Sequence, residues 1–298
     1  MLRVDHDFRA MGGPGRLRLE VTGRAQADAA IAAALAEVGR LERKYSRYLE
    51  DSVTTRINRA AGADPVSIDA ETAGLLDYAD TVWRESDGLF DLTSGVLRRA
   101  WDFSADRLPA QADIDALLPL VDWQAVERDA QTVRLARPGM EIDLGGVVKE
   151  YAADAAAAQL RDAGVAAALV DLAGDMVAVG TPADRPGWPV GIRHPAQRQQ
   201  AIAALELPPG ALASSGDYER CITVDGRRYG HVLDPRSGWP VRGLVAVSVL
   251  APQCMVAGSA ATVALLKGAQ GIAWLDALGL PWLAVDDDLQ CHGTLARA

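Results

Sequence analysis

The sequence is poor in cysteine. Its 298 residues include Cys221, Cys254 and Cys291, and no two of these are in C-x-x-C spacing. An odd, widely spaced set of this kind gives neither a disulfide framework nor a zinc-ribbon pattern. The chain is therefore expected in a reducing compartment, where these residues are ordinary structural thiols.

Clusters of basic residues are also missing. Thirty lysines and arginines stand against forty aspartates and glutamates, which gives a formal net charge of −10. Nucleic acid and anionic membrane surfaces both need a basic footprint, so neither is an expected partner. A site for an anionic cofactor would have to neutralise charge locally, through a lysine, backbone N–H groups or a metal ion.

Long hydrophobic runs are missing too. The longest apolar run, residues 255–266, is too short to cross a bilayer, which takes about 20 residues. The first residues show no basic region followed by an apolar stretch, and no lipoprotein-type cysteine. The chain as given is therefore expected to be cytoplasmic and without a membrane span, although a chain trimmed of a leader would look the same.

Several common catalytic motifs do not occur. The sequence contains no G-x-x-x-x-G-K-[ST], G-x-G-x-x-G, H-E-x-x-H or G-x-S-x-G, and its four histidines have no zinc-type spacing. These absences argue against P-loop NTPases, Rossmann dehydrogenases, zincins and α/β-hydrolases. They leave enzymes of other classes open.

Hydrophobic periodicity predicts an α+β fold without regular βαβ alternation. Apolar residues at helical spacing indicate amphipathic helices at residues 26–45 and 69–85, the second ended by Gly88. The other expected elements are a strand at 17–21, a short strand at 142–146, a helix at 147–161, a strand–turn–strand at 167–179, an edge strand within 180–195, strands at 202–207, 228–233 and 244–250, helices at 256–266 and 270–278, and a strand near residue 283. Residues 104–138 indicate only a short helix, a loop and a strand.

Two segments combine glycines with carboxylates. Residues 86–95, S-D-G-L-F-D-L-T-S-G, form either a helix C-cap with a polar turn or a ligand loop that presents Phe90 and Asp91 on irregular backbone. Residues 143–151, D-L-G-G-V-V-K-E-Y, place two glycines before a helix. Backbone N–H groups there can approach an anion, and Lys149 can reach the same charge. The alternative is a tight strand-to-helix turn with a solvated lysine.

Two further segments carry hydroxyls and a histidine. Residues 214–220, S-S-G-D-Y-E-R, are followed by residues 231–238, H-V-L-D-P-R-S-G. His231 is expected on a strand just before the turn, and the polar cluster nearby favours a catalytic over a structural histidine. Residues 257–262, A-G-S-A-A-T, lie on an apolar helix, where small residues typically indicate close helix packing.

In this order, the segments resemble the ApbE family of FAD:protein FMN transferases. The pattern of that family runs M-G-T, S-x-Y, D-S, L-N, G-x-F-D, D-L-G-[GA]-x-x-K-G-Y, S-G-D-Y-x-R, H-x-x-D-P-[RK]-T-G and A-D-x-x-[AS]-T. The corresponding residues are 11–13, 46–48, 51–52, 57–58, 88–91, 143–151, 215–220, 231–238 and 257–262. Each motif is weak alone, whereas the ordered set is specific.

The resemblance implies a T-fold-related α+β architecture of mixed sheets with packed helices. It further implies one domain over residues 1–298, or two intertwined subdomains with a FAD site in the cleft between them. FAD is then the substrate, Mg²⁺ assists, and FMN passes to a Ser or Thr hydroxyl of an acceptor flavoprotein with release of AMP. This is phosphoryl transfer, in which the protein positions groups and neutralises charge.

The resemblance also assigns residues to the site. Those expected to line the flavin or adenine pockets are Met11, Tyr48, Leu89, Phe90 and Asp91. Asp143 and Lys149 are expected to hold the cofactor, with Lys149 near the phosphates, and Val232 to contact it through its backbone. His231 is the candidate for deprotonating the acceptor hydroxyl, and Asp217 is a second catalytic candidate.

The implied magnesium site departs from the family pattern at one position. The family holds the ion with a backbone carbonyl of the D-L-G-[GA] turn and with an Asp and a Thr four residues apart on one helix face. Gly146 and Thr262 occupy two of these positions, but Gly258 replaces the aspartate and offers no side-chain oxygen. Glu150 replaces the usual glycine after Lys149 and is expected to be a solvated glutamate at the helix N-terminus. The alternative is that it partly replaces the missing aspartate.

The departures leave more than one function open. Gly13 also stands where the family has threonine, and Ser237 replaces another threonine. The leading hypothesis is an FMN transferase with weakened or rearranged metal binding. The second is a homologue that binds FAD without transferring FMN, or hydrolyses it slowly. A structural α+β protein outside the family is the third, and the ordered motifs argue against it.

Overall fold

The computed structural model describes residues 1–197, 199–218 and 220–297. In this part of the chain eight strands form one large sheet in the order β1-β2-β6-β7-β10-β13-β14-β15, and all neighbouring pairs are antiparallel. The strands are β1 (Leu2–Ala10), β2 (Gly13–Val21), β6 (Ala167–Leu172), β7 (Asp175–Val179), β10 (Gly210–Gly216), β13 (Leu244–Ala251), β14 (Trp282–Asp286) and β15 (Cys291–His292). Because β2 pairs with β6, the N-terminal hairpin lies beside a hairpin from the middle of the chain.

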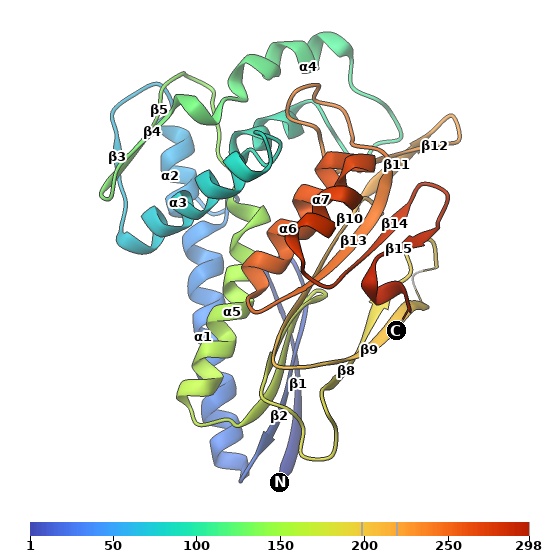
Figure 1. Cartoon of the computed structure of the whole chain (residues 1–298). Coiled ribbons are helices and arrows are strands. Elements are labelled where there is room, and N and C mark those ends of the chain that lie inside the picture. Colours follow the sequence, from blue (N-terminus) through green and yellow to red (C-terminus); the bar gives the residue numbers. More distant parts are fainter. Residues whose placement is uncertain (198, 219, 298) are drawn as a thin grey trace.

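Helices α1 (Arg24–Tyr45), α5 (Val148–Asp162) and α6 (Cys254–Lys267) cover one face of this sheet (Figure 1). In α5 the buried face consists mainly of alanines at three- and four-residue spacing, among them Ala153 and Ala157, both 0% exposed. These small side chains let α1 and α5 lie side by side along much of their length (Figure 1). Among the described residues there is no helix long and apolar enough to cross a membrane.

A hairpin of β8 (Trp188–Arg193) and β9 (Ala201–Leu207) covers part of the other face (Figure 1). Alternate residues of β8, namely Trp188, Val190 and Ile192, are buried and pack with Leu169 and Leu212 of the large sheet. The alternation is typical of a strand with one face in the core. The middle of the large sheet is therefore buried on both faces.

Most of the elements between α1 and α5 lie beyond the N-terminal end of α5, at the top of Figure 1. The segments between α1 and α5 are α2 (Val53–Arg59), β3 (Val66–Ser67), α3 (Ala70–Glu85), η1 (Leu92–Arg99), α4 (Gln111–Leu117), η2 (Leu118–Leu120), η3 (Trp123–Ala125), β4 (Val126–Arg128), β5 (Thr132–Leu135) and η4 (Leu144–Gly146), where η denotes a 3-10 helix. Later elements are β11 (Cys221–Val224), β12 (Arg227–Gly230), η5 (Gly268–Gln270), α7 (Gly271–Leu278) and η6 (Thr294–Arg297). Of these, α7 lies beside α6, and η6 lies beside β14 and β15. Strands β3, β5 and β4 form a small sheet, and β11 pairs with β12.

The predicted α+β class is confirmed, and so are most predicted elements. Helices α1, α3, α5, α6 and α7 begin and end within two residues of their predicted bounds. The start of α3 has a clear local cause, because the Asp69 carboxylate accepts a hydrogen bond from Thr72 N at 3.0 Å. The edge strand predicted within residues 180–195 is β8.

The prediction of a short strand at residues 142–146 is wrong. The backbone N–H and C=O of Ile142 form hydrogen bonds with the side chain of Asn58. Asp143 N donates to Leu92 O at 2.9 Å, and the chain then turns into η4. Since these backbone groups are already paired, no neighbouring strand can bond to them.

Other strand predictions need correction as well. β12 ends at Gly230, so His231 lies just beyond the strand rather than on it. Ser214 and Ser215, for which no strand was predicted, lie on β10, whose small residues give no clear alternation. β1 was not predicted either, because charged residues alternate with half-buried ones along this edge strand.

Candidate functional site

Asp143 holds the glycine turn before α5 in place. Its carboxylate accepts a hydrogen bond from Gly145 N at 3.0 Å and forms ion pairs with Arg98 and with Arg47, whose Nη1 lies 3.5 Å away. The backbone bond from Asp143 to Leu92 ties the same turn to η1. Asp143 therefore brings two of the predicted motifs together and fixes the position of the turn.

Lys149 forms a largely buried ion pair with Asp175. Its Nζ lies 2.7 Å from Asp175 Oδ2 on β7, and the Asp175 side chain is 2% exposed. Burial works to lower the pKa of Lys149, but the charges of Asp175 and Glu150 outweigh it and raise the pKa above its ordinary value. Lys149 is thus a fixed cation in the first turn of α5, where helix N–H groups also favour an anion.

The two retained positions of the predicted metal site lie close to other site residues. Thr262 Oγ1 on α6 is 2.7 Å from Ser215 Oγ on β10. A Cβ on Gly146 would lie 3.6 Å from Phe90 Cζ, and η4, which contains Gly146, contacts α6. The structure therefore brings the glycine turn, the small-residue helix and the serine-containing strand to one place.

The prediction of a solvated Glu150 is wrong. The residue is 6% exposed because α6 packs across the first turns of α5. Its Cγ lies 2.5 Å from the position that a Cβ on Gly258 would take. Burial, together with the nearby carboxylate of Asp175, raises the pKa of Glu150 well above its ordinary value.

Met11 lies in the turn between β1 and β2. Its backbone has a φ of 52°, and its N–H donates to Glu42 Oε1 at 2.8 Å. A Cβ on Gly13 would lie 2.8 Å from Ala173 Cβ, which explains why threonine does not fit at this position. Ala173 belongs to the turn that leads into Asp175, so the Met11 turn is adjacent to the Lys149 ion pair.

In the Ser46-Arg47-Tyr48 motif, the side chain of Arg47 is directed into the protein and that of Tyr48 towards the solvent. Arg47 faces inward and pairs with Glu141 at 2.8 Å as well as with Asp143. Tyr48 is 79% exposed, and its N–H donates to Ser46 Oγ at 3.2 Å. The predicted contact of Tyr48 with a flavin or adenine ring would therefore be made at the protein surface.

The loop after α3 is largely buried. Leu89 and Phe90 are 8% and 5% exposed. Asp91 Oδ1 accepts a hydrogen bond from Thr93 N at 2.7 Å, and Oδ2 accepts one from Trp123 N at 3.2 Å. Burial raises the pKa of Asp91. These bonds give Asp91 a scaffold role at the start of η1, next to Phe90, which faces Gly146.

His231 lies directly after β12, at the start of the loop of residues 231–238. Its Nδ1 lies 3.2 Å from Arg220 O. In the tautomer that donates a proton to this carbonyl, Nε2 carries the lone pair that a general base needs. The next residue, Val232, accepts a hydrogen bond at its carbonyl from Val241 N at 3.0 Å, which holds the two arms of the loop together.

Asp217 lies behind this loop. A Cβ on Gly230, the residue before His231, would be 2.5 Å from Asp217 Cβ. The Asp217 carboxylate accepts a hydrogen bond from Arg228 at 3.0 Å, and burial raises its pKa. These contacts place Asp217 as a support of the His231 segment, bonded to β12.

The loop of residues 231–238 is fastened to the loop after α3. Arg236 donates to Asp87 O at 2.7 Å, and Lys267 Nζ lies 2.8 Å from Asp87 Oδ2. On the other side, the indole of Trp101 donates to Gly238 O at 2.8 Å. Motifs that are far apart in the sequence are thus held at fixed relative positions.

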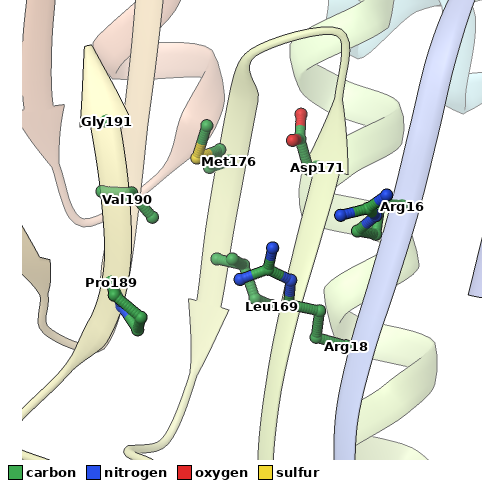
Figure 2. A pocket seen from close by; sticks show the side chains of 8 residues that line it. All are labelled: Arg16, Arg18, Leu169, Asp171, Met176, Pro189, Val190 and Gly191. Carbon is green, nitrogen blue, oxygen red and sulfur yellow. The ribbon is translucent and has the colours of Figure 1, made fainter. Parts of the chain in front are cut away.

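A small, half-open pocket lies elsewhere in the fold. Figure 2 shows its lining side chains, which come from β2, β6, β7 and β8. The volume of the pocket is about 160 Å³. Its lining residues are Arg16, Arg18, Leu169, Asp171, Met176, Pro189, Val190 and Gly191. None of the predicted site residues is among them, because this pocket lies between the β8–β9 hairpin and the sheet.

Sequence reasoning missed Asp175 as a site residue. The signal was present in D-L-A-G-D, residues 171–175, a polar glycine turn between two strongly apolar strands. Sequence reasoning also missed that Glu150 is buried. Within residues 1–197, 199–218 and 220–297, no group of three or more His, Cys, Asp or Glu side chains is placed to hold a metal ion. A cation here would therefore need backbone and hydroxyl oxygens as well.

These features define an α+β protein whose motif-bearing loops meet around the N-terminus of α5. The chain belongs to the ApbE family, whose model matches residues 11–283. A FAD:protein FMN transferase of Klebsiella pneumoniae (strain 342) is 37% identical over 196 residues, which is 64% of this chain and 60% of that protein. A FAD:protein FMN transferase of Rhodobacter capsulatus is 32% identical over 85% of this chain and 49% of that protein. The chain thus spans less than two thirds of both relatives.

A solved structure has the same fold over nearly the whole chain. The ApbE protein of Thermotoga maritima superimposes with a TM-score of 0.90 at 28% identity, over 98% of this chain and 97% of that one. The fold predicted from the resemblance is therefore confirmed.

Proposed function

We propose that the chain transfers FMN from FAD to a Ser or Thr hydroxyl of an acceptor flavoprotein, with Mg²⁺ and with release of AMP. The observation that carries the proposal is the Lys149–Asp175 ion pair at the glycine turn before α5, on which the family motifs converge. A fixed cation beside helix N–H groups is suited to a diphosphate. The names of the relatives in this family support the same activity.

We place the FAD site where the loop after α3, the glycine turn and the His231 loop meet. The apolar side chains of Met11, Leu89 and Phe90 would line its ring pockets, and Val232 would contact it through its backbone. Lys149 would neutralise the diphosphate, and Asp175 keeps the lysine in position. In this placement FAD would lie between the α2–α4 segment and the C-terminal half of the chain.

The reaction breaks one bond and forms one. The acceptor hydroxyl oxygen attacks the phosphorus of the riboflavin phosphate half, and the P–O bond to the AMP half breaks. AMP leaves with the bridging oxygen, and the hydroxyl proton passes to Nε2 of His231. The main task of the protein is to position these groups and to offset the charge of the phosphates.

The residues present fit a magnesium ion. Gly146 can offer its backbone carbonyl and Thr262 its hydroxyl, and Mg²⁺ prefers such oxygen ligands. Glu150 Oε2 is buried and has no hydrogen-bond partner among the described residues, as expected of an oxygen that a cation would bind. When bound, the ion would offset part of the diphosphate charge.

The test is a transfer assay with an acceptor flavoprotein from the same genome. The protein is incubated with FAD, MgCl₂ and the acceptor, and we expect an acid-stable fluorescent flavin adduct and AMP in equal amounts. Replacing the acceptor Ser or Thr by Ala should abolish the adduct. AMP without adduct would indicate a FAD hydrolase, and bound FAD with neither product would indicate a binding protein, and either result would overturn the proposal.

The role of His231 is tested by His231→Ala. We expect transfer to fall by about a hundredfold or more, the usual size of a general-base contribution, while FAD affinity changes little. His6→Ala on the edge strand β1 is the matched control and should leave both unchanged. Equal losses of transfer and FAD affinity in His231→Ala would contradict a role as base.

A further inference from the structure

The side chain of Glu150 fills the space that an aspartate at position 258 would need. A Cβ on Gly258 would lie 2.5 Å from Glu150 Cγ, 2.9 Å from Oε1 and 3.0 Å from Cδ. A Cβ there could be accommodated only if the buried Glu150 side chain moved out of this space. The space therefore holds a carboxylate from only one of the two positions at a time, and in this chain Glu150 supplies it.

The packing of α5 against α6 sets this arrangement. The Asp154 carboxylate accepts hydrogen bonds from Cys254 N at 2.9 Å and from Met255 N at 3.0 Å, and so caps the start of α6. Glu150 lies one turn before Asp154, and Gly258 lies one turn after Cys254. Because the two helices run in opposite directions, these single turns bring positions 150 and 258 face to face.

The same register leads to the other two positions of the metal site. One further step of four residues goes from Glu150 back to Gly146 and from Gly258 on to Thr262. η4, which contains Gly146, contacts α6. The Glu150 side chain faces Gly258 and is thus one helix turn along α6 from Thr262 and four residues along the chain from Gly146.

The Glu150 carboxylate lies among charged neighbours, Lys149 and Asp175, but in the described part of the chain one of its oxygens is left without a hydrogen bond. Its Oε2 is buried with no hydrogen-bond partner among the described residues. The neighbouring cation, Lys149, forms its ion pair with Asp175 and not with Glu150. Burying an unpaired carboxylate is costly unless it is protonated or binds a cation. The unpaired oxygen is therefore a second observation, independent of the packing, that points to a ligand.

We propose that Glu150 is the carboxylate ligand of a divalent cation site, in place of the residue at position 258. The carbonyl of Gly146 and the hydroxyl of Thr262 complete the protein ligands, and this all-oxygen set suits Mg²⁺ or Mn²⁺. Position 258 is a glycine because the longer side chain from α5 occupies its space. The proposal rests on the proposed function for the presence of a cation site and names the residue that forms it.

The experiment measures metal binding directly, with MnCl₂ by electron paramagnetic resonance and with MgCl₂ by the shift in Tm, each with and without FAD. The variants are Glu150→Gln, which keeps the shape and removes the charge, and the exchange Glu150→Gly with Gly258→Asp. Glu127→Gln, at an exposed position of β4, is the matched control. We expect Glu150→Gln to weaken Mn²⁺ binding by at least about tenfold. Loss of a residue that only hydrogen-bonds to a metal ligand already has an effect of this size.

Further readouts separate metal ligation from structural damage. Glu150→Gln should keep or raise the Tm of the metal-free protein, since it removes an unpaired buried charge, while the Mg²⁺-induced shift is lost. The exchange variant should recover Mn²⁺ affinity to within about threefold of the unmodified protein, because it moves the carboxylate to the family position. Gly258→Asp alone should unfold at a lower temperature, because two side chains then compete for one space.

Three results would overturn the proposal. They are Mn²⁺ affinity unchanged in Glu150→Gln, a folded exchange variant that does not recover binding, and no Mn²⁺ binding to the unmodified protein with or without FAD. Failure of the proposed function looks different, because metal binding would still depend on Glu150 while no FMN adduct formed. Conversely, if FMN transfer occurred and metal affinity did not depend on Glu150, the proposed function would be supported and Glu150 would be excluded as a metal ligand.

Discussion

Asn58 and Ile142 are joined by two hydrogen bonds, although they are far apart in the sequence. Asn58 Nδ2 donates to Ile142 O at 3.0 Å, and Ile142 N donates to Asn58 Oδ1 at 2.7 Å. The side-chain amide thus pairs with a peptide unit as a neighbouring strand would. The bond pair fixes the backbone directly before Asp143 and so positions the glycine turn of the site.

Replacing Asn58 by Ala should destabilise the fold and loosen this turn. It leaves the N–H and C=O of the buried Ile142 without partners, so we expect a loss of about 2–3 kcal/mol in the free energy of unfolding. Urea unfolding measures the loss, and hydrogen exchange should show faster exchange at the Ile142 amide. Asn58→Asp keeps the acceptor and should protect that amide more than Ala does. Unchanged exchange in both variants would contradict a positioning role for Asn58.

Replacing Gly258 by Ala should lower stability although alanine favours helices. The added Cβ would meet Glu150 Cγ at 2.5 Å, and overpacking of this kind costs about 1–3 kcal/mol against a gain of about 1 kcal/mol in helix propensity. With Glu150→Gly in the background, the same change should stabilise, because the space is open. Thermal unfolding of the four proteins in this cycle checks the reversal of sign. The same effect in both backgrounds would show that Glu150 does not occupy the space.

Replacing Lys149 by Met should destabilise the fold as well as weaken FAD binding. The change leaves the buried carboxylate of Asp175 unpaired, and we expect a loss of about 2–4 kcal/mol. Adding Asp175→Asn should recover part of this stability, because the charge that needed a partner is gone, whereas FAD affinity should stay low. Urea unfolding and FAD titration measure the two effects separately. Additive stability losses would argue against a coupled pair.

Glu71 should make the protein sensitive to acid. Hydrogen bonds from Arg40, joined by Lys44, lower its pKa from 4.5 to about 2. The folded-state pKa lies below the unfolded one, so the stabilisation is present above about pH 4.5 and is lost as the pH falls towards 2. Because Arg40 is 42% exposed, screening by solvent reduces the contribution to about 1–2 kcal/mol.

Glu71→Gln tests this contribution. The variant should be less stable than the unmodified protein at pH 7, and the difference should shrink as the pH approaches 2. Unfolding by urea at several pH values measures the difference. A gap that stays constant from pH 7 to pH 2 would show that the charge of Glu71 is not its source.

The long helices could be predicted from the sequence because their cause is local. Residues close together in the sequence provide the apolar spacing of α1 and α3 and the Asp69 cap. The predicted bounds of these helices agree with the observed ones within two residues. The ordered motifs likewise identified the family and so the fold. The strand predicted at residues 142–146 is absent for a non-local reason, since Asn58 and Leu92 take its hydrogen bonds.

The site shows the same division between local and non-local causes. The sequence by itself determined the candidate residues around Lys149 and His231, because the order of the motifs is a property of the chain. The tertiary structure alone decided that Asp175 pairs with Lys149, and that Glu150 is buried against Gly258 rather than solvated. The burial of a side chain depends on which distant helix packs over it. Here the register between α5 and α6 determines that Glu150 is buried.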